Sequence, residues 1–98
     1  MKIVWITGGS SGIGLATAKK FLNNNWKVII SSRSEEKLVS AKEKILQNSN
    51  NKELFYFVCD ISKRDDVKKT VEEIGIKIGD INLAILNAAA YSPNKDQG

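Results

Sequence analysis

The stretch Thr7-Gly8-Gly9-Ser10-Ser11-Gly12-Ile13-Gly14 decides the fold of this chain. It follows an apolar run at residues 3–6, typical of a strand buried on both faces, and it precedes apolar residues at helical spacing. A glycine-rich turn between a strand and a helix N-terminus favours phosphate, because main-chain N–H groups are accessible and the helix dipole attracts negative charge. We expect Gly8 to turn the chain, Gly12 to admit a diphosphate and Gly14 to pack the helix against the sheet. The alternative is a turn that binds no ligand.

Predicted strands and helices alternate along the rest of the chain. Strands are expected at residues 3–6, 26–32, 54–59 and 81–86, separated by helices near residues 12–23, 35–46 and 63–78. Ser34 and Ser62 are predicted N-caps, with Asp65 completing a capping box after Ser62. Tyr56 is expected in the core. The buried face of the third helix is predicted to consist of Val67, Val71, Ile74 and Ile78.

This order predicts a Rossmann-type three-layer α/β/α fold, with a parallel sheet in the strand order 3-2-1-4 that stops after strand four. Residues 1–98 would then form one nucleotide-binding half-domain. The fourth strand is apolar throughout and would leave an open hydrophobic edge. We therefore expect the sequence to be the N-terminal portion of a longer enzyme.

The composition excludes several classes of function. The chain has 98 residues, of which 42% are hydrophobic and 27% charged, and its net charge is +4. Lysines are interspersed with glutamates and there are only two arginines, so solvated helix faces are favoured over a nucleic-acid surface. The absence of histidine and the single cysteine, Cys59, argue against a metal site or a disulfide and favour a cytoplasmic protein. No apolar run is long enough to span a membrane.

The end of the second strand bears on the choice of cofactor. In this fold, proteins that bind NAD usually place an acidic residue here, whereas proteins that bind NADP place an arginine nearby. The sequence has Ser32 and Arg33 at this point and no carboxylate before Glu35. A guanidinium group can hold a 2′-phosphate by two hydrogen bonds, so NADP(H) is preferred over NAD(H). The alternative is a solvent-exposed arginine at the start of a loop.

Four motifs carry a family resemblance, one of them at residues 33–38, which resemble the family's loop into the second helix. The spacing TGxxxGxG resembles the cofactor loop of the short-chain dehydrogenase/reductase family. Cys59-Asp60-Ile61 is similar to the element after the family's third strand, which implies that Asp60 contacts the adenine amino group; the alternative is a turn or capping residue. Residues 86–89 stand in the place of the family's N-N-A-G element, with Leu86 and Ala89 as departures. The cofactor-binding residues that we expect are Thr7, Gly8, Ser10, Ser11, Gly12, Ile13, Gly14, Ser32, Arg33, Asp60, Ile61, Asn87, Ala88 and Ala89.

The resemblance implies hydride transfer between a nicotinamide and a small-molecule carbonyl or alcohol substrate, in a protein that forms homo-oligomers. The family's Ser-Tyr-Lys catalytic group follows later strands. Tyr91 and Lys95 fit Y-x-x-x-K, but Pro93 disfavours the helix that would put both on one face, so no catalytic residue is predicted in this chain.

The alternative to part of an oxidoreductase is a non-catalytic nucleotide-binding or interaction module, complete at 98 residues. An S-adenosylmethionine-dependent enzyme is a third possibility, disfavoured because no acidic residue closes the second strand.

Overall fold

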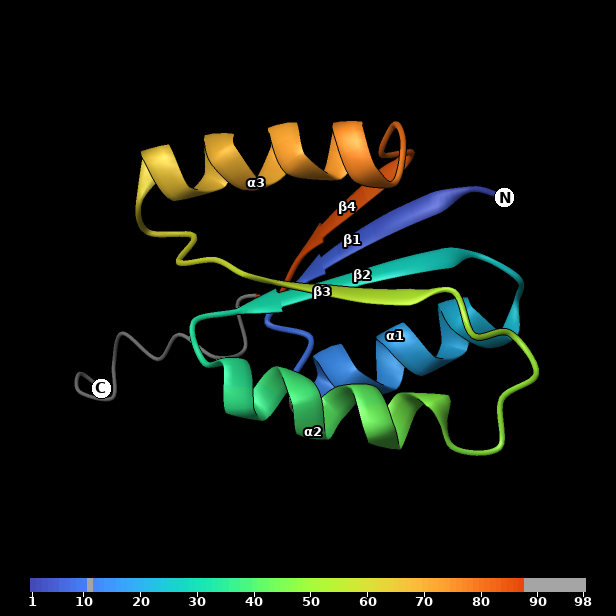
Figure 1. The fold of residues 1–98 in the computed structure, drawn as a ribbon. Coiled ribbons are helices and arrows are strands. Elements are labelled where there is room, and N and C mark those ends of the chain that lie inside the picture. Colours follow the sequence, from blue (N-terminus) through green and yellow to red (C-terminus); the bar gives the residue numbers. More distant parts are fainter. Residues whose placement is uncertain (11, 88–98) are drawn as a thin grey trace.

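A computed structural model describes residues 1–10 and 12–87 of the chain. The elements are, in order, β1 (Ile3–Thr7), α1 (Gly12–Asn23), β2 (Lys27–Ser32), α2 (Glu35–Leu46), β3 (Leu54–Val58), α3 (Arg64–Lys77) and β4 (Leu83–Leu86). The strands are parallel and lie in the order β3-β2-β1-β4. Helices α1 and α2 cover one face of the sheet and α3 covers the other (Figure 1). The predicted fold class and strand order are confirmed.

Alternate residues of the inner strands fill two separate cores. Val4 and Ile6 belong to a cluster that includes buried residues of α1 and α2, such as Leu22 and Leu38. Ile3 and Trp5 belong to the cluster on the other face, with Ile74 of α3. This division follows from the strand period of two, which directs successive side chains to opposite faces of the sheet. Both faces of β1 are therefore buried, which explains its unbroken apolar sequence.

Local signals fix several of the helix ends. The Ser34 hydroxyl accepts a hydrogen bond from the N–H of Lys37 at 3.3 Å, so the predicted cap of α2 is confirmed. Asn25 follows α1 with a φ of 67°, a left-handed conformation that asparagine tolerates. At the end of α3, Gly79 has a φ of 141° and its N–H donates to the carbonyl of Ile74 at 2.9 Å. Gly79 therefore ends this helix, as expected.

Two local predictions are wrong, and a third, that Tyr56 lies in the core, is only partly right because Tyr56 packs against the core from its margin. Ser62 does not cap α3, because its hydroxyl donates to the carboxylate of Asp60, and Lys63 occupies the N-cap position without a side-chain hydrogen bond. On the same helix Val71 is 43% exposed, whereas its neighbour Thr70 is buried. Tyr56 is only half-buried, and its hydroxyl donates to the Glu35 carboxylate at 3.1 Å. Hydrogen bonds to carboxylates account for the positions of Ser62 and Tyr56, and packing on the sheet selects Thr70 over Val71.

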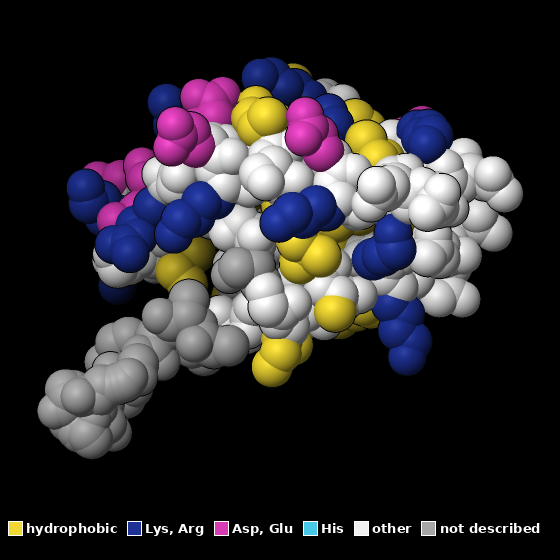
Figure 2. Space-filling model, turned by 90° about the horizontal axis from the view of Figure 1, so that it is seen from below, with side chains coloured by type: hydrophobic (Ala, Val, Ile, Leu, Met, Phe, Trp, Pro, Cys, Tyr) yellow, Lys and Arg dark blue, Asp and Glu magenta, His cyan; other side chains and the backbone are white. Residues whose placement is uncertain are grey.

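The surface is polar over two of the helices and apolar along one sheet edge. The face formed by α1 and α2 carries basic and acidic side chains together with separate apolar ones (Figure 2). Strand β4 pairs with β1 alone among the described strands, and Leu83 and Leu86 on it are exposed. The predicted hydrophobic edge is therefore present. None of the helices within residues 1–10 and 12–87 has the length and apolar character needed to cross a membrane.

Candidate functional site: the carboxyl edge of the sheet

The turn between β1 and α1 has the conformation that its glycines allow. Gly8 has a φ of 71° and Gly12 a φ of 55°, values that side-chain-bearing residues rarely adopt. The N–H of Gly8 donates to the carbonyl of Ser31 at 2.8 Å, which joins the turn to the end of β2. Helix α1 then begins at Gly12 with no acidic residue in its first turn. The start of α1 therefore combines the positive end of a helix dipole with no competing carboxylate.

The glycines of this turn differ in the space around them. A Cβ atom added at Gly12 would meet no described residue within 4 Å other than its chain neighbours and the backbone of its own helix, so the turn is open on that side. A Cβ atom at Gly14 would overlap the Gly8 carbonyl and lie 2.7 Å from Nδ2 of Asn87. These surroundings agree with the predicted roles of Gly12 in admitting a ligand and of Gly14 in close packing. A Cβ atom at Gly9 would lie 2.6 Å from Cγ2 of Ile30, a packing role that the sequence analysis missed.

Asn87 joins the end of β4 to the glycine turn. Its side-chain amide donates to the carbonyl of Gly8 at 3.2 Å, and its main-chain N–H donates to the hydroxyl of Thr7 at 3.2 Å. The Thr7 hydroxyl in turn donates to the carbonyl of Ile85 at 3.4 Å. Thr7, Gly8 and Asn87 are thus brought together, as the sequence predicted. Their hydrogen bonds hold the β1 turn against β4.

The other residues expected near this turn have different positions. Ser10 lies within the turn and is half-buried. The Ile13 side chain, in the first turn of α1, is 69% exposed. An apolar side chain this exposed beside an open turn is available to contact a ligand. Ser11, Ala88 and Ala89 lie outside the described residues.

At the end of β2, the exposed cationic side chain among the described residues is Arg33. Ser32 is engaged internally, since its hydroxyl donates to the carbonyl of Ser34 at 3.2 Å and its own carbonyl accepts from the N–H of Cys59 at 2.9 Å. Arg33 is exposed and makes no hydrogen bond to another described residue. Glu35, the first carboxylate after β2, is hydrogen-bonded to Tyr56. Of these residues, Arg33 is the one whose charge is available to a ligand.

Asp60 follows β3 in a tightly hydrogen-bonded loop. Its Oδ1 atom accepts from the N–H of Ser62 at 3.0 Å and from the Ser62 hydroxyl at 2.7 Å. These bonds lower the pKa of the Asp60 carboxyl, most of all the bond from the hydroxyl; partial burial opposes the shift, and the charges of Arg33 and Lys63 add to it. Asp60 is therefore ionised at neutral pH. The turn role that the sequence left open for Asp60 is present, and its neighbour Ile61 is 50% exposed.

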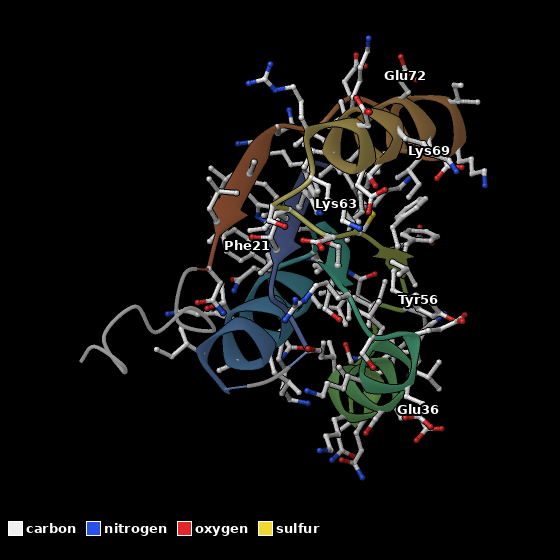
Figure 3. All side chains as sticks on the ribbon, turned by 90° about the vertical axis from the view of Figure 1, so that its left-hand side faces the viewer. Phe21, Glu36, Tyr56, Lys63, Lys69 and Glu72 are labelled. Atoms are coloured by element: carbon white, nitrogen blue, oxygen red, sulfur yellow. The ribbon has the colours of Figure 1, made fainter. Side chains whose placement is uncertain are left out.

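The described site residues lie along one edge of the sheet, because the parallel strands all end there. Figure 3 views the molecule towards this edge, with Lys63 between α3 and the strand ends. The residues form two groups, one at the ends of β1 and β4 and the other at the ends of β2 and β3. Ser62 and Asp66 hold the second group in place and were not predicted there, although the spacing Asp-x-Ser is a known turn signal.

Sequence comparisons relate the chain to known proteins. The sequence pattern of a family described as short chain dehydrogenase matches residues 2–97. Glucose 1-dehydrogenase of Gluconobacter oxydans is 35% identical over 96 residues, which are 98% of this chain and 36% of that protein. Short-chain dehydrogenase/reductase 3 of Homo sapiens is 37% identical over 87 residues, 88% of this chain and 28% of that protein. The chain thus spans about a third of the length of the curated relatives it matches.

Comparison with solved structures also relates the chain to short-chain dehydrogenases and oxidoreductases. A short-chain dehydrogenase from Bacillus anthracis superposes with a TM-score of 0.81 at 38% identity, covering 90% of this chain and 35% of that chain. A short-chain oxidoreductase from Pseudomonas aeruginosa, described as bound to NADPH and as having an atypical catalytic centre, has a TM-score of 0.79 at 31% identity. That match covers 85% of this chain and 32% of the other.

Proposed function

This chain belongs to the short-chain dehydrogenase family, and from that premise we propose that it binds NADP(H) at the carboxyl edge of its sheet. The glycine turn holds the diphosphate, Arg33 holds the 2′-phosphate and Asp60 contacts the adenine. The bound cofactor supplies the hydride chemistry, while the protein binds and orients it. The whole protein is an oxidoreductase acting on a small-molecule carbonyl or alcohol, and it assembles as a homo-oligomer.

The observation that carries this proposal is the open side of the turn at Gly12. Apart from the chain neighbours of Gly12 and the backbone of its own helix, no atom of the described residues lies within 4 Å of the position that a Cβ atom would take there. This space lies at the start of α1, where main-chain N–H groups have no partner within the helix. A diphosphate can approach such a turn more closely than any side chain would permit, and its charge is favoured by the helix dipole. The surroundings of Gly12 therefore fit the group that the fold implies.

The preference for NADP(H) is supported by the charges near the end of β2. Arg33 is exposed and without a hydrogen bond to the described residues, so its guanidinium group can turn towards a phosphate. The first carboxylate of α2, Glu35, is hydrogen-bonded to Tyr56 at the side of β3. No acidic side chain between Ser32 and Ser34 would repel a 2′-phosphate. Asp60 is near enough to interact with Arg33, so a bound phosphate would share this cation with it.

Replacement of Arg33 by alanine tests the proposal. We expect Arg33→Ala to weaken NADPH binding by about tenfold to a hundredfold, the range for hydrogen bonds to charged groups, and to change NADH binding by less than about threefold. Dissociation constants for both cofactors, measured by calorimetric titration, give the comparison. Arg64→Ala is the matched control, because Arg64 is an exposed arginine at the start of α3.

The outcomes separate the two parts of the proposal. Equal losses of NADPH and NADH affinity in Arg33→Ala would contradict the role in binding the 2′-phosphate. Failure of the unmodified protein to bind either cofactor would contradict the adenine dinucleotide site as a whole.

A further inference from the structure

Ser62 has a role in the loop after β3 that differs from helix capping. Its N–H and its hydroxyl both donate to the same oxygen of Asp60, Oδ1, at 3.0 and 2.7 Å. The hydroxyl is therefore not available to the first turn of α3, which has no side-chain cap. Two donors on one carboxylate oxygen restrict rotation of that carboxylate about its Cβ–Cγ bond. Oδ1 is therefore committed to the protein.

The main chain of Asp60 is fixed as well. Its N–H donates to Oδ2 of Asp66 in the first turn of α3 at 3.1 Å, and its carbonyl accepts from the N–H of Lys63 at 3.0 Å. In contrast, Oδ2 of Asp60 makes no hydrogen bond to any residue that the structure describes. The loop thus holds an ionised carboxylate with one oxygen available. An ionised carboxylate oxygen can only accept hydrogen bonds.

We propose that Ser62 is a positioning residue for adenine recognition: it holds Asp60 so that Oδ2 accepts a hydrogen bond from the exocyclic amino group of the cofactor. The inference rests on the proposed function, since it requires an adenine nucleotide at this edge of the sheet. Without the Ser62 hydroxyl, Oδ1 would keep only the main-chain N–H of residue 62, and the less restrained carboxylate would be drawn towards Arg33 and Lys63, the cations whose charges act on it. The adenine would then have to order the carboxylate on binding, at a cost in affinity.

Affinity for two cofactors that differ in the base, at the C6 substituent and at the adjoining N1, tests this role. NADPH carries the amino group, and its deaminated analogue with hypoxanthine in place of adenine carries an oxygen there. We expect Ser62→Ala to weaken NADPH binding by about three- to tenfold and to change binding of the analogue by less than about twofold. Ser62→Thr restores the hydroxyl and should bind NADPH as the unmodified protein does. Ser40→Ala, at an exposed serine of α2, is the matched control and should change neither affinity.

A second variant tests the same orientation without removing Ser62. In Asp60→Asn the two donors of Ser62 should select the amide oxygen and leave the amide NH₂ at the position of Oδ2. This group donates, so the preference should reverse, with NADPH weakened by about tenfold or more and the hypoxanthine analogue strengthened. If Ser62→Ala does not fold, as judged by circular dichroism, Asp60→Asn decides alone. Where both variants fold, adding Ser62→Ala to Asp60→Asn should reduce the reversed preference for the hypoxanthine analogue over NADPH.

Each outcome has a distinct meaning. Equal losses for the two cofactors in Ser62→Ala would show that Ser62 only shapes the loop, and the inference would be wrong. A lack of rescue by Ser62→Thr, or an unchanged preference in Asp60→Asn, would also overturn it. If the unmodified protein bound neither cofactor, the proposed function itself would be wrong and this inference would be lost with it.

Discussion

The turn after β1 and the loop after β3 lie on the same edge of the sheet but are constructed from different atoms. At β1 the main chain predominates, because Gly14 packs against Gly8 and Asn87 with no room for a side chain. At β3 side chains predominate, since Ser62 and Asp66 hold Asp60 through hydrogen bonds. The first region is close-packed, whereas Ser62 in the second is exposed.

This difference corresponds to the parts of the cofactor that each region is proposed to bind. A diphosphate is common to all dinucleotides, so main-chain N–H groups at a helix N-terminus are sufficient for it. The base differs from one nucleotide to another, so its recognition after β3 requires side chains with chosen donors and acceptors. Substitutions after β1 should therefore alter folding and binding together. Substitutions after β3 should alter specificity with little change in stability.

The largest effect is expected for a methyl group added at Gly14. A Cβ atom there would lie 2.9 Å from Cα of Gly9 and still closer to the Asn87 amide and the Gly8 carbonyl. We expect Gly14→Ala to lower the free energy of unfolding by about 1–3 kcal/mol or more, the range for overpacking, and to abolish cofactor binding. Gly75→Ala is the matched control, because a Cβ atom in that exposed part of α3 would meet no described residue within 4 Å outside the helix itself.

The control should change stability in the opposite direction. Alanine has a higher helix propensity than glycine, so Gly75→Ala should raise the free energy of unfolding by about 0.5–1 kcal/mol. Urea denaturation of both variants measures the contrast. Similar changes in the two variants would mean that the β1 turn tolerates a side chain at Gly14 and is not close-packed.

An intermediate effect is expected at the junction of the β1 turn with β4. Thr7→Val keeps the shape of the buried side chain but removes the hydroxyl that donates to Ile85 and accepts from Asn87. We expect a loss of about 1–3 kcal/mol in the free energy of unfolding, because a buried polar group loses its partner. Amide exchange at Asn87 should also accelerate. Thr7→Ser retains the hydroxyl and should protect this amide as threonine does; equal exchange in Thr7→Val would contradict the junction.

The region after β1 was predicted well from the sequence because its signals are local. A strand, a glycine turn and a helix follow one another within residues 3–23, and the space required at Gly12 and Gly14 follows from the spacing of the glycines. The role of Gly9 could not be found in this way, since its neighbour Ile30 lies on another strand. The sequence likewise could not show which of Thr70 and Val71 is buried on the inner face of α3. Both positions suit one face of a helix, and only packing on the sheet selects Thr70.

The region after β3 was predicted less well because two local signals compete. Ser62 precedes a helix and resembles an N-cap, but it also stands two residues after Asp60, the spacing of an Asx turn. The carboxylate accepts both donors of Ser62, and it is the better acceptor because it is ionised. Expected contacts with a cofactor, such as that of Asp60 with adenine, remain predictions from the family resemblance.

The smallest expected effect is a dependence on pH of the stability that Ser62 contributes in the loop after β3. The hydrogen bonds from Ser62 lower the pKa of the Asp60 carboxyl in the folded protein, so the unfolded chain binds the proton more readily. The stability that these bonds contribute is complete above the pKa of an unfolded aspartate, about 3.9, and is lost as the pH falls through the lower pKa of the folded state. The difference in melting temperature between the unmodified protein and Ser62→Ala should therefore be constant near neutral pH and shrink below about pH 4.

In an Asp60→Asn background, where no carboxyl titrates at this position, the difference due to Ser62→Ala should not vary with pH. A difference that persisted unchanged into strong acid in the presence of Asp60 would mean that Ser62 stabilises the loop independently of this carboxylate, and the contrast with the main-chain turn after β1 would lose its basis.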